Sequence, residues 1–110
     1  MHEITDIERL EEMKSSGAVL ILFGGKQCHV CQVLRPKLEN MLQSHYPDMQ
    51  AAYVDCETSA DICAQHGVFS LPVVKVYIEG MQISEFARSF SVDQLRQSIY
   101  RSYTMWHESR

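Results

Sequence analysis

The segment Gly24–Pro36, with the sequence GGKQCHVCQVLRP, joins an apolar strand to an amphipathic helix and carries two cysteines. The preceding residues, Ala18–Phe23, are all apolar, which is typical of a strand that is buried on both faces. After the cysteines, apolar side chains recur at helical spacing as far as about Ser44. The pattern therefore predicts that Cys28 lies at a helix N-terminus, where backbone N–H groups and the helix dipole stabilise a thiolate.

The spacing of Cys28 and Cys31 predicts thiol–disulfide exchange. One helical turn separates the two residues, so their sulfurs can close a small disulfide ring. We expect Cys28 to attack a disulfide in another protein, and Cys31 to attack the mixed disulfide and release the product. No cofactor is needed beyond an electron donor. The simpler alternatives are a structural pair or half of a zinc site, which would require two further ligands.

The other two cysteines, Cys56 and Cys63, could complete a site with four cysteines. The six residues between them are expected to span a loop and a helix, which is unlike a compact zinc knuckle. We therefore expect Cys56 and Cys63 to be small buried hydrophobic residues, with a second redox or regulatory pair as the alternative.

Length and composition predict one soluble domain over residues 1–110. The chain is 45% apolar and contains no linker or repeat, so a single core is expected. Its net charge of −4 argues against nucleic acid and anionic membranes as partners. Met1–Met13 has no basic stretch followed by an apolar one, so we expect no secretory signal and a cytoplasmic protein. Paired cysteines in a reducing cytosol are more often catalytic or metal-binding than structural.

The remaining patterns predict an α/β fold. Right-handed crossovers would make the first part a parallel βαβ unit with helices on both faces, and a C-terminal hairpin would extend the sheet antiparallel. The expected elements are a helix opened by a capping box at Thr5-Asp6-Ile7-Glu8, strands at Ala18–Phe23 and Gln50–Asp55, a helix after Cys28 that Pro36 kinks or locally disrupts, a short helix at Ser59–His66, hairpin strands at Val73–Ile78 and Gln82–Phe86 joined by Glu79-Gly80, and a helix capped by Ser91.

The sequence resembles the thioredoxin family over nearly its whole length. The resemblance rests on the cysteine motif after a buried strand, Pro36 five residues beyond Cys31, the Leu71-Pro72 pair that opens the hairpin, and the terminal amphipathic helix. It implies a thioredoxin-like fold and a cis peptide bond before Pro72, beside the cysteines. The backbone of Leu71 and Val73 would then be free to pair with an extended substrate segment. The implied partners are proteins with disulfides and an electron-donor reductase.

Four positions depart from the family pattern. Gln27 stands where thioredoxins usually have tryptophan, and Leu22 replaces their buried acid, which accepts the proton of the resolving thiol. Ala51 replaces the lysine that pairs with this acid, and Arg88 replaces a glycine near the substrate groove. The family's first strand is reduced to Met1–Ile4. These departures argue for a specialised function rather than broad reduction of many substrates.

His29 lies between the cysteines, and two interpretations of it remain open. It is either a solvent-facing spacer or an imidazolium that stabilises the Cys28 thiolate and makes the disulfide more oxidising. We expect the other histidines to be surface residues because they show no ligand spacing: His2, His45, His66 and His107.

The function predicted best is a thiol–disulfide oxidoreductase that contributes to cell redox homeostasis. Its catalytic residues would be Cys28 and Cys31, and its substrate-binding residues would be His29, Leu71, Pro72, Val73 and Arg88. Two other functions remain possible from the sequence: a non-catalytic binding module that uses the groove only to hold a partner, or a specialised redox sensor or chaperone.

Overall fold

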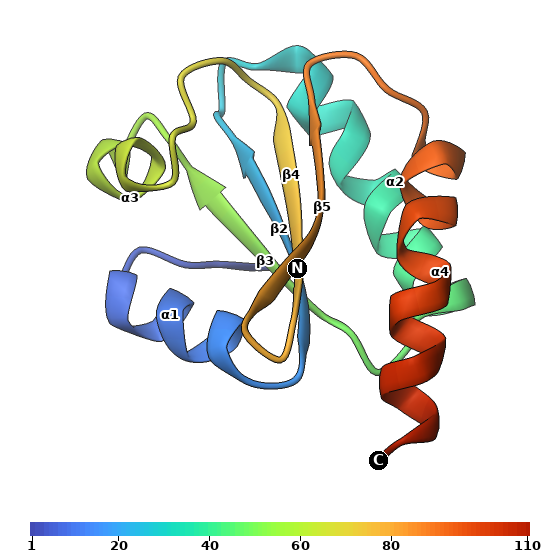
Figure 1. Cartoon of the computed structure of the whole chain (residues 1–110). Coiled ribbons are helices and arrows are strands. Elements are labelled where there is room, and N and C mark those ends of the chain that lie inside the picture. The colour runs from blue at the N-terminus through green and yellow to red at the C-terminus, as the bar shows by residue number, and fades with distance from the viewer.

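A five-stranded sheet in the order β1-β3-β2-β4-β5 forms the centre of the structure, a computed structural model that describes residues 1–110 (Figure 1). The strands are β1 (His2–Glu3), β2 (Ala18–Gly24), β3 (Gln50–Asp55), β4 (Val73–Ile78) and β5 (Met81–Ala87). The helices are α1 (Ile7–Ser15), α2 (His29–His45), α3 (Ala60–Gln65) and α4 (Val92–Glu108). This is the predicted order of elements, with a first strand of only two residues.

The sheet is mixed, as predicted. β1, β3 and β2 run parallel, with Leu22 of β2 opposite Tyr53 of β3 and Gly24 opposite Asp55. β4 runs antiparallel to β2, and β5 runs antiparallel to β4. The parallel βαβ unit followed by an antiparallel hairpin is therefore confirmed.

Helices cover both faces of the sheet, with α1 and α3 on one face and α2 and α4 on the other (Figure 1). Leu20 and Leu22 of β2 belong to the core that includes residues of α2 and α4. Val19, Ile21 and Phe23 belong to the core that includes residues of α1 and α3. Because successive side chains of a strand point to opposite faces, a central strand between two cores needs apolar residues at every position.

The hairpin between β4 and β5 turns at Glu79 and Gly80, as predicted. Both residues have positive φ values, 48° and 85°, which is the pattern of a two-residue turn that matches the twist of the strands. The Glu79 carboxylate accepts hydrogen bonds from the Gly17 N–H and the Trp106 Nε1–H, each at 2.9 Å. This turn therefore ties the N-terminal part of the chain to α4.

Some local features of the helices differ from the prediction. α1 is capped by Asp6, whose carboxylate accepts the Glu8 N–H at 3.0 Å, so the predicted capping box at Thr5 is wrong. Asp is at least as good an N-cap acceptor as Thr, and Asp6 directly precedes the first helical residue. α2 is continuous over 17 residues through Pro36; proline has no N–H for the helical hydrogen bond, so the predicted effect on hydrogen bonding stays local and does not end the helix. At α4 the capping box of Ser91 and Gln94 is present.

No helix of the structure combines the length and the apolar character that a membrane span requires.

Candidate active site

Cys28 and Cys31 form a disulfide at the N-terminus of α2, directly beyond the carboxyl end of β2. Their Cα atoms lie 5.3 Å apart. Cys28 is the N-cap residue, and its Sγ accepts a hydrogen bond from the Cys31 backbone N–H at 3.2 Å. A donor of the first helical turn therefore points at the Cys28 sulfur, which is the arrangement that stabilises a thiolate.

The two cysteines differ in exposure. Cys28 is half-buried, whereas Cys31 is 0% exposed. Cys31 packs against Gly24, where an added Cβ would lie 3.0 Å from the Cys31 Cβ and 3.1 Å from the Tyr53 ring. An approaching partner can therefore reach the sulfur of Cys28 far more readily than that of Cys31.

Pro72 lies on the other side of β2 from Tyr53. Phe23 of β2 is opposite Val73 of β4, so Pro72, one residue earlier, comes opposite Gly24, on which Cys31 packs. The Leu71–Pro72 peptide bond is cis, as the resemblance implied. Leu71 precedes β4, whereas Val73 lies within the sheet and is only 6% exposed.

Arg88 follows β5 and contacts the loop that contains Pro72. Its backbone N–H donates to the Pro72 carbonyl at 2.8 Å, and its guanidinium lies 3.5 Å from the Ser70 hydroxyl. Arg88 has a φ of 65°, in the left-handed region that glycine adopts at little cost. The glycine that the resemblance implies at this position would adopt this φ at little cost, whereas Arg88 places an exposed cation at the edge of the site.

Glu57, which the sequence analysis did not single out, holds the loop before Cys28. Its Oε2 accepts the Gln27 backbone N–H at 2.9 Å. The neighbouring Cys56 N–H donates to the Gly24 carbonyl at 2.8 Å. The loop after β3 therefore supports the loop after β2, as expected where parallel strands end at the same edge of a sheet. Because Glu57 directly follows a predicted strand of this sheet, its position in the sequence could have identified it.

A family model described as Thioredoxin matches residues 3–101 of the chain. The chain belongs to the thioredoxin family. It is similar to the thioredoxin-like protein YdfQ of Bacillus subtilis, with 24% identity over 106 residues that cover 96% of this chain and 92% of YdfQ. Thioredoxin of Chlamydia trachomatis is 29% identical over 83 residues, which cover 76% of this chain and 80% of that protein. The structure of Fasciola hepatica thioredoxin superposes with a TM-score of 0.78 at 22% identity, covering 92% and 98% of the two chains.

Membership of the thioredoxin family and a cysteine pair at disulfide distance support thiol–disulfide oxidoreductase activity for this chain. The departures at the site remain in the folded protein. Leu22 is 0% exposed and apolar, and Ala51 lies opposite Leu20 on the neighbouring strand. β2 therefore supplies no carboxylate beneath Cys31.

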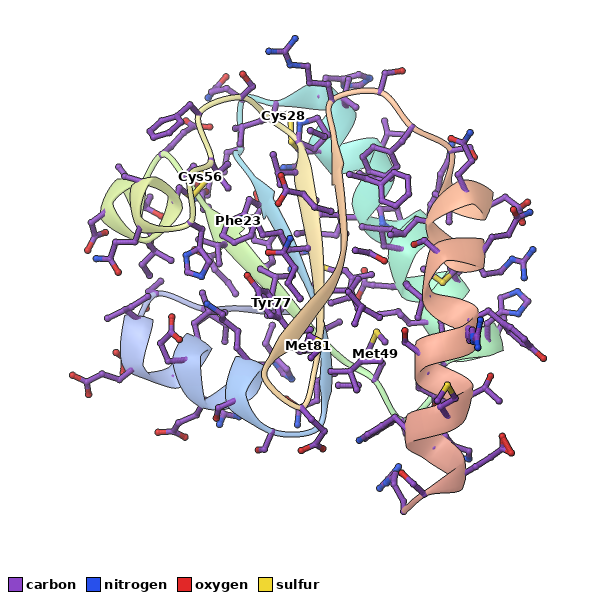
Figure 2. All side chains as sticks on the ribbon, viewed as in Figure 1. Phe23, Cys28, Met49, Cys56, Tyr77 and Met81 are labelled. Atoms are coloured by element: carbon purple, nitrogen blue, oxygen red, sulfur yellow. A yellow bond between two sulfur atoms is a disulfide. The ribbon has the colours of Figure 1, made fainter.

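Cys56 and Cys63 form a second disulfide, with Cα atoms 5.7 Å apart. The expectation that they are simply small buried hydrophobic residues is therefore wrong. The chain folds back after Asp55, whose carbonyl accepts the Ser59 N–H at 2.8 Å, and the first turn of α3 then brings Cys63 beside Cys56. Figure 2 shows Cys56 beside α3, at the same end of the sheet as Cys28.

His66 is the exception among the histidines expected at the surface, because its side chain is only 5% exposed. It lies at the end of α3, against the Phe23 ring and Lys14. No local sequence pattern indicates this burial, because Lys14 is 52 residues distant along the chain. The other four histidines are exposed: His2, His29, His45 and His107.

Proposed function

We propose that this thioredoxin-family protein exchanges protein disulfides with Cys28 as the attacking thiolate and Cys31 as the resolving thiol. The observation that carries the assignment is the difference between the two sulfurs at one helix terminus. Cys28 is half-buried and accepts a helix N–H, whereas Cys31 is 0% exposed. A thiolate must be both stabilised and accessible to attack a second protein.

The exchange proceeds in two steps. The Cys28 thiolate attacks one sulfur of the substrate disulfide, so that a mixed disulfide forms and the other substrate sulfur leaves as a thiolate. Cys31 then attacks the Cys28 sulfur, the bond from Cys28 to the substrate breaks, and the second substrate thiolate leaves. Two electrons pass to the substrate, and the Cys28–Cys31 disulfide seen in the structure is the product form.

We assign substrate binding to the surface around the cysteine pair. Leu71 and Pro72 would offer backbone groups to an extended segment, with Val73 contributing only through its backbone. His29 and Arg88 would contact the substrate at the two edges. A groove of about 560 Å³ adjoins the pair, lined on one wall by Val30, Val33 and Leu34 of α2 and on the other by Phe90, Ser91 and Val92, with His29 and Lys37 at its edge.

The physiological cycle that we propose requires an electron-donor reductase, which would return Cys28 and Cys31 to the dithiol form in a cytoplasmic setting and so contribute to redox homeostasis. The position of Cys28 at a helix N-terminus is that of a catalytic cysteine. A catalytic rather than structural pair is what a reducing cytosol favours, which supports the cytoplasmic setting. The Cys56–Cys63 disulfide argues in the other direction, because structural disulfides persist in oxidising compartments. Mass-tagged alkylation of all four cysteines in intact cells tests the compartment through the redox state of each pair.

A redox sensor is the second candidate, and the Cys56–Cys63 disulfide favours it. Cys56 donates to the Gly24 carbonyl, and the adjacent Glu57 holds Gln27. A change in the redox state of Cys56 would therefore reach the loop that precedes Cys28. The sensor interpretation requires that reduction of this second disulfide changes the rate at which Cys28 reacts.

Reduction of insulin disulfides with dithiothreitol as the electron source tests the main proposal. We expect the wild type to accelerate the reaction, Cys28→Ser to abolish the acceleration, and Cys31→Ser to accumulate a mixed disulfide through Cys28. Cys56→Ser serves as the matched control, and a changed rate in this variant would support the sensor. A wild type that does not accelerate the reaction but still binds insulin would identify a binding module instead.

A further inference from the structure

The Asp55 Oδ2 and the Tyr53 hydroxyl are buried side-chain oxygens that make no hydrogen bond of ordinary geometry, although the Gln32 side chain lies close enough to Tyr53 to lower its pKa slightly against the larger effect of burial. No other buried side-chain nitrogen or oxygen of the chain lacks a hydrogen bond. Asp55 is 0% exposed and Tyr53 is 2% exposed. Buried polar groups are normally paired, and Asp55 is the only buried carboxylate residue of the chain. Asp55 is therefore a candidate for a function that the fold alone does not require, with Tyr53 next to it on the same face of the strand.

Both side chains lie on the face of β3 that is directed at Cys31. Residues two apart on a strand share a face, and Asp55 is paired with Gly24 across the sheet. An added Cβ on Gly24 would lie 3.1 Å from the Tyr53 Cε1 and 3.2 Å from the Cys31 Sγ. Paired residues of neighbouring strands project their side chains about 5 Å apart. The pairing therefore places Asp55 next to Gly24, on the same face of the sheet as Tyr53, and Cys31 packs on Gly24 from that face.

Asp55 stabilises the local fold through its Oδ1 and its backbone carbonyl, not through Oδ2. Its Oδ1 accepts the Glu57 N–H at 2.8 Å, and its carbonyl accepts the Ser59 N–H at 2.8 Å. Both bonds hold the turn that leads into α3, and an asparagine would make them equally well. The charge of the carboxylate and the free Oδ2 are thus left without a structural explanation.

We propose that the Asp55 carboxylate, with the Tyr53 hydroxyl beside it, accepts the proton of the Cys31 thiol. The inference rests on the proposed exchange reaction. In the mixed disulfide, the Cys31 S–H proton passes to Asp55 Oδ2, and the Cys31 thiolate attacks the Cys28 sulfur. The bond from Cys28 to the substrate breaks, and the leaving substrate thiolate takes up a proton from water. Asp55 then releases its proton to solvent, and Cys31 has no proton to donate once the disulfide has formed.

None of the other charged groups near Tyr53 and Asp55 is placed to accept the Cys31 proton. Arg35 of α2 lies over the Tyr53 ring, 4.4 Å from its centroid. Glu57 is exposed and accepts the Gln27 N–H, and the exposed Glu3 on β1 acts on Tyr53 from the far side. Burial, followed by the nearby Asp55, raises the pKa of Tyr53, so this hydroxyl keeps its proton and can only assist.

The decay of the mixed disulfide in a single turnover tests the proposal. Reduced protein is mixed with an uncharged disulfide-bonded peptide, quenched with acid, and followed by mass spectrometry from pH 6 to pH 9.5. We compare the wild type with Asp55→Asn, which retains the turn bonds, and with Asp61→Asn, which removes an exposed carboxylate of α3. The rate at which the mixed disulfide forms measures the reactivity of Cys28, and the rate at which it decays measures the reactivity of Cys31.

We expect Asp55→Asn to slow the decay about tenfold or more near pH 6.5. The effect should shrink as the pH rises, because hydroxide can then remove the Cys31 proton without help from Asp55. Formation of the mixed disulfide should be unchanged, and Asp61→Asn should match the wild type in both steps. An unchanged decay in Asp55→Asn, or an equal slowing at every pH, would overturn the inference while leaving the exchange reaction intact. A wild type that forms no mixed disulfide would instead overturn the proposed function, and this inference with it.

A measurement on the wild type keeps the proposal testable if Asp55→Asn does not fold. Carbon-13 NMR of the Asp55 carboxyl is recorded against pH in the disulfide and dithiol forms. A shared proton predicts that the Asp55 titration moves to higher pH on reduction, because the two groups then titrate as a pair. Identical titrations in the two forms would refute the proposal.

Discussion

At the scale of single residues, glycine at position 24 allows the resolving cysteine to pack directly on the sheet. An added Cβ would meet the Cys31 Cβ at 3.0 Å and the Tyr53 ring at 3.1 Å, and neither group can move away inside the core. Gly25 differs, because its nearest neighbour is the Glu57 carboxylate at the end of an exposed side chain. Adjacent glycines therefore tolerate a methyl group very differently.

We predict that Gly24→Ala lowers the free energy of unfolding by about 1–3 kcal/mol, the usual cost of overpacking a core. Gly25→Ala is the matched control, and its loss should be smaller because the exposed Glu57 side chain can move at the cost of its hydrogen bond from the Gln27 N–H. Urea denaturation of both variants in the disulfide form measures the difference. Equal losses in the two variants would contradict the packing described for Cys31.

The sequence predicted the positions of the cysteine pair and of the cis proline better than their surroundings. Cys28, Cys31 and Pro72 could be identified because the local pattern and the family resemblance place them without knowledge of strand pairing. Tyr53 and Asp55 could not be identified in this way, because their position beside Cys31 depends on the register between β2 and β3. Packing across the whole sheet sets that register, so no short segment of the sequence predicts it.

At the scale of elements, His66 links α1, α3 and β4. Its Nδ1 lies 2.8 Å from the Ile62 carbonyl, and its Nε2 lies 3.0 Å from the Lys14 ammonium. The Lys75 ammonium of β4 donates to the His66 carbonyl at 2.7 Å. A neutral ring with its proton on Nδ1 satisfies both contacts, whereas a second proton on Nε2 would face the Lys14 charge.

Burial lowers the pKa of His66 below its ordinary value of 6.5, and Lys14 acts in the same direction against the Ile62 carbonyl. The unfolded chain therefore gains a proton on this residue before the folded protein does as the pH falls. We predict that the free energy of unfolding decreases below about pH 6.5, by at most about 1.4 kcal/mol per pH unit from this group.

Urea denaturation between pH 5 and pH 8 checks the prediction for His66. His66→Gln should lose part of the pH dependence, whereas His45→Gln, which alters an exposed histidine, should keep all of it. The comparison uses the slope against pH, so a constant cost of the substitution does not matter. Parallel curves for the wild type and His66→Gln would show that the burial of His66 has no effect on its titration.

At the scale of the whole molecule, the layered fold was predictable and the distribution of charge was not. The continuous apolar run of β2 and the helical spacing in α2 and α4 are properties of the sequence, so the two cores followed from it. Ion pairs join residues through the fold, as in the contact of Lys75 with Glu85 across the hairpin. Half of the ten lysines and arginines form no ion pair with a carboxylate: Lys26, Arg35, Lys37, Arg88 and Arg101.

Three of these cations surround the cysteine pair, although the chain has a net charge of −4. Lys26 lies two residues before Cys28, Lys37 lines the groove beside it, and Arg88 contacts the Pro72 loop. The exposed Glu57 is one carboxylate near these three cations, and it retains its charge while it accepts the Gln27 N–H. The site thus presents a positive edge, which would favour substrates that carry acidic residues next to their disulfide.

We predict that a disulfide-bonded peptide flanked by glutamate is reduced with a kcat/KM about three- to tenfold higher than one flanked by lysine, with a difference that shrinks at high salt. Lys37→Glu and Arg88→Glu should each reduce this preference, because they place a carboxylate where the acidic peptide would dock. Arg101→Glu makes the same change in charge on α4, outside the groove, and should leave the preference unchanged. Reduction of the uncharged 2-hydroxyethyl disulfide should be similar in all of these proteins. A preference that falls equally in Arg101→Glu would mean that only the net charge of the chain matters, and equal rates for the two peptides would mean that the positive edge selects nothing.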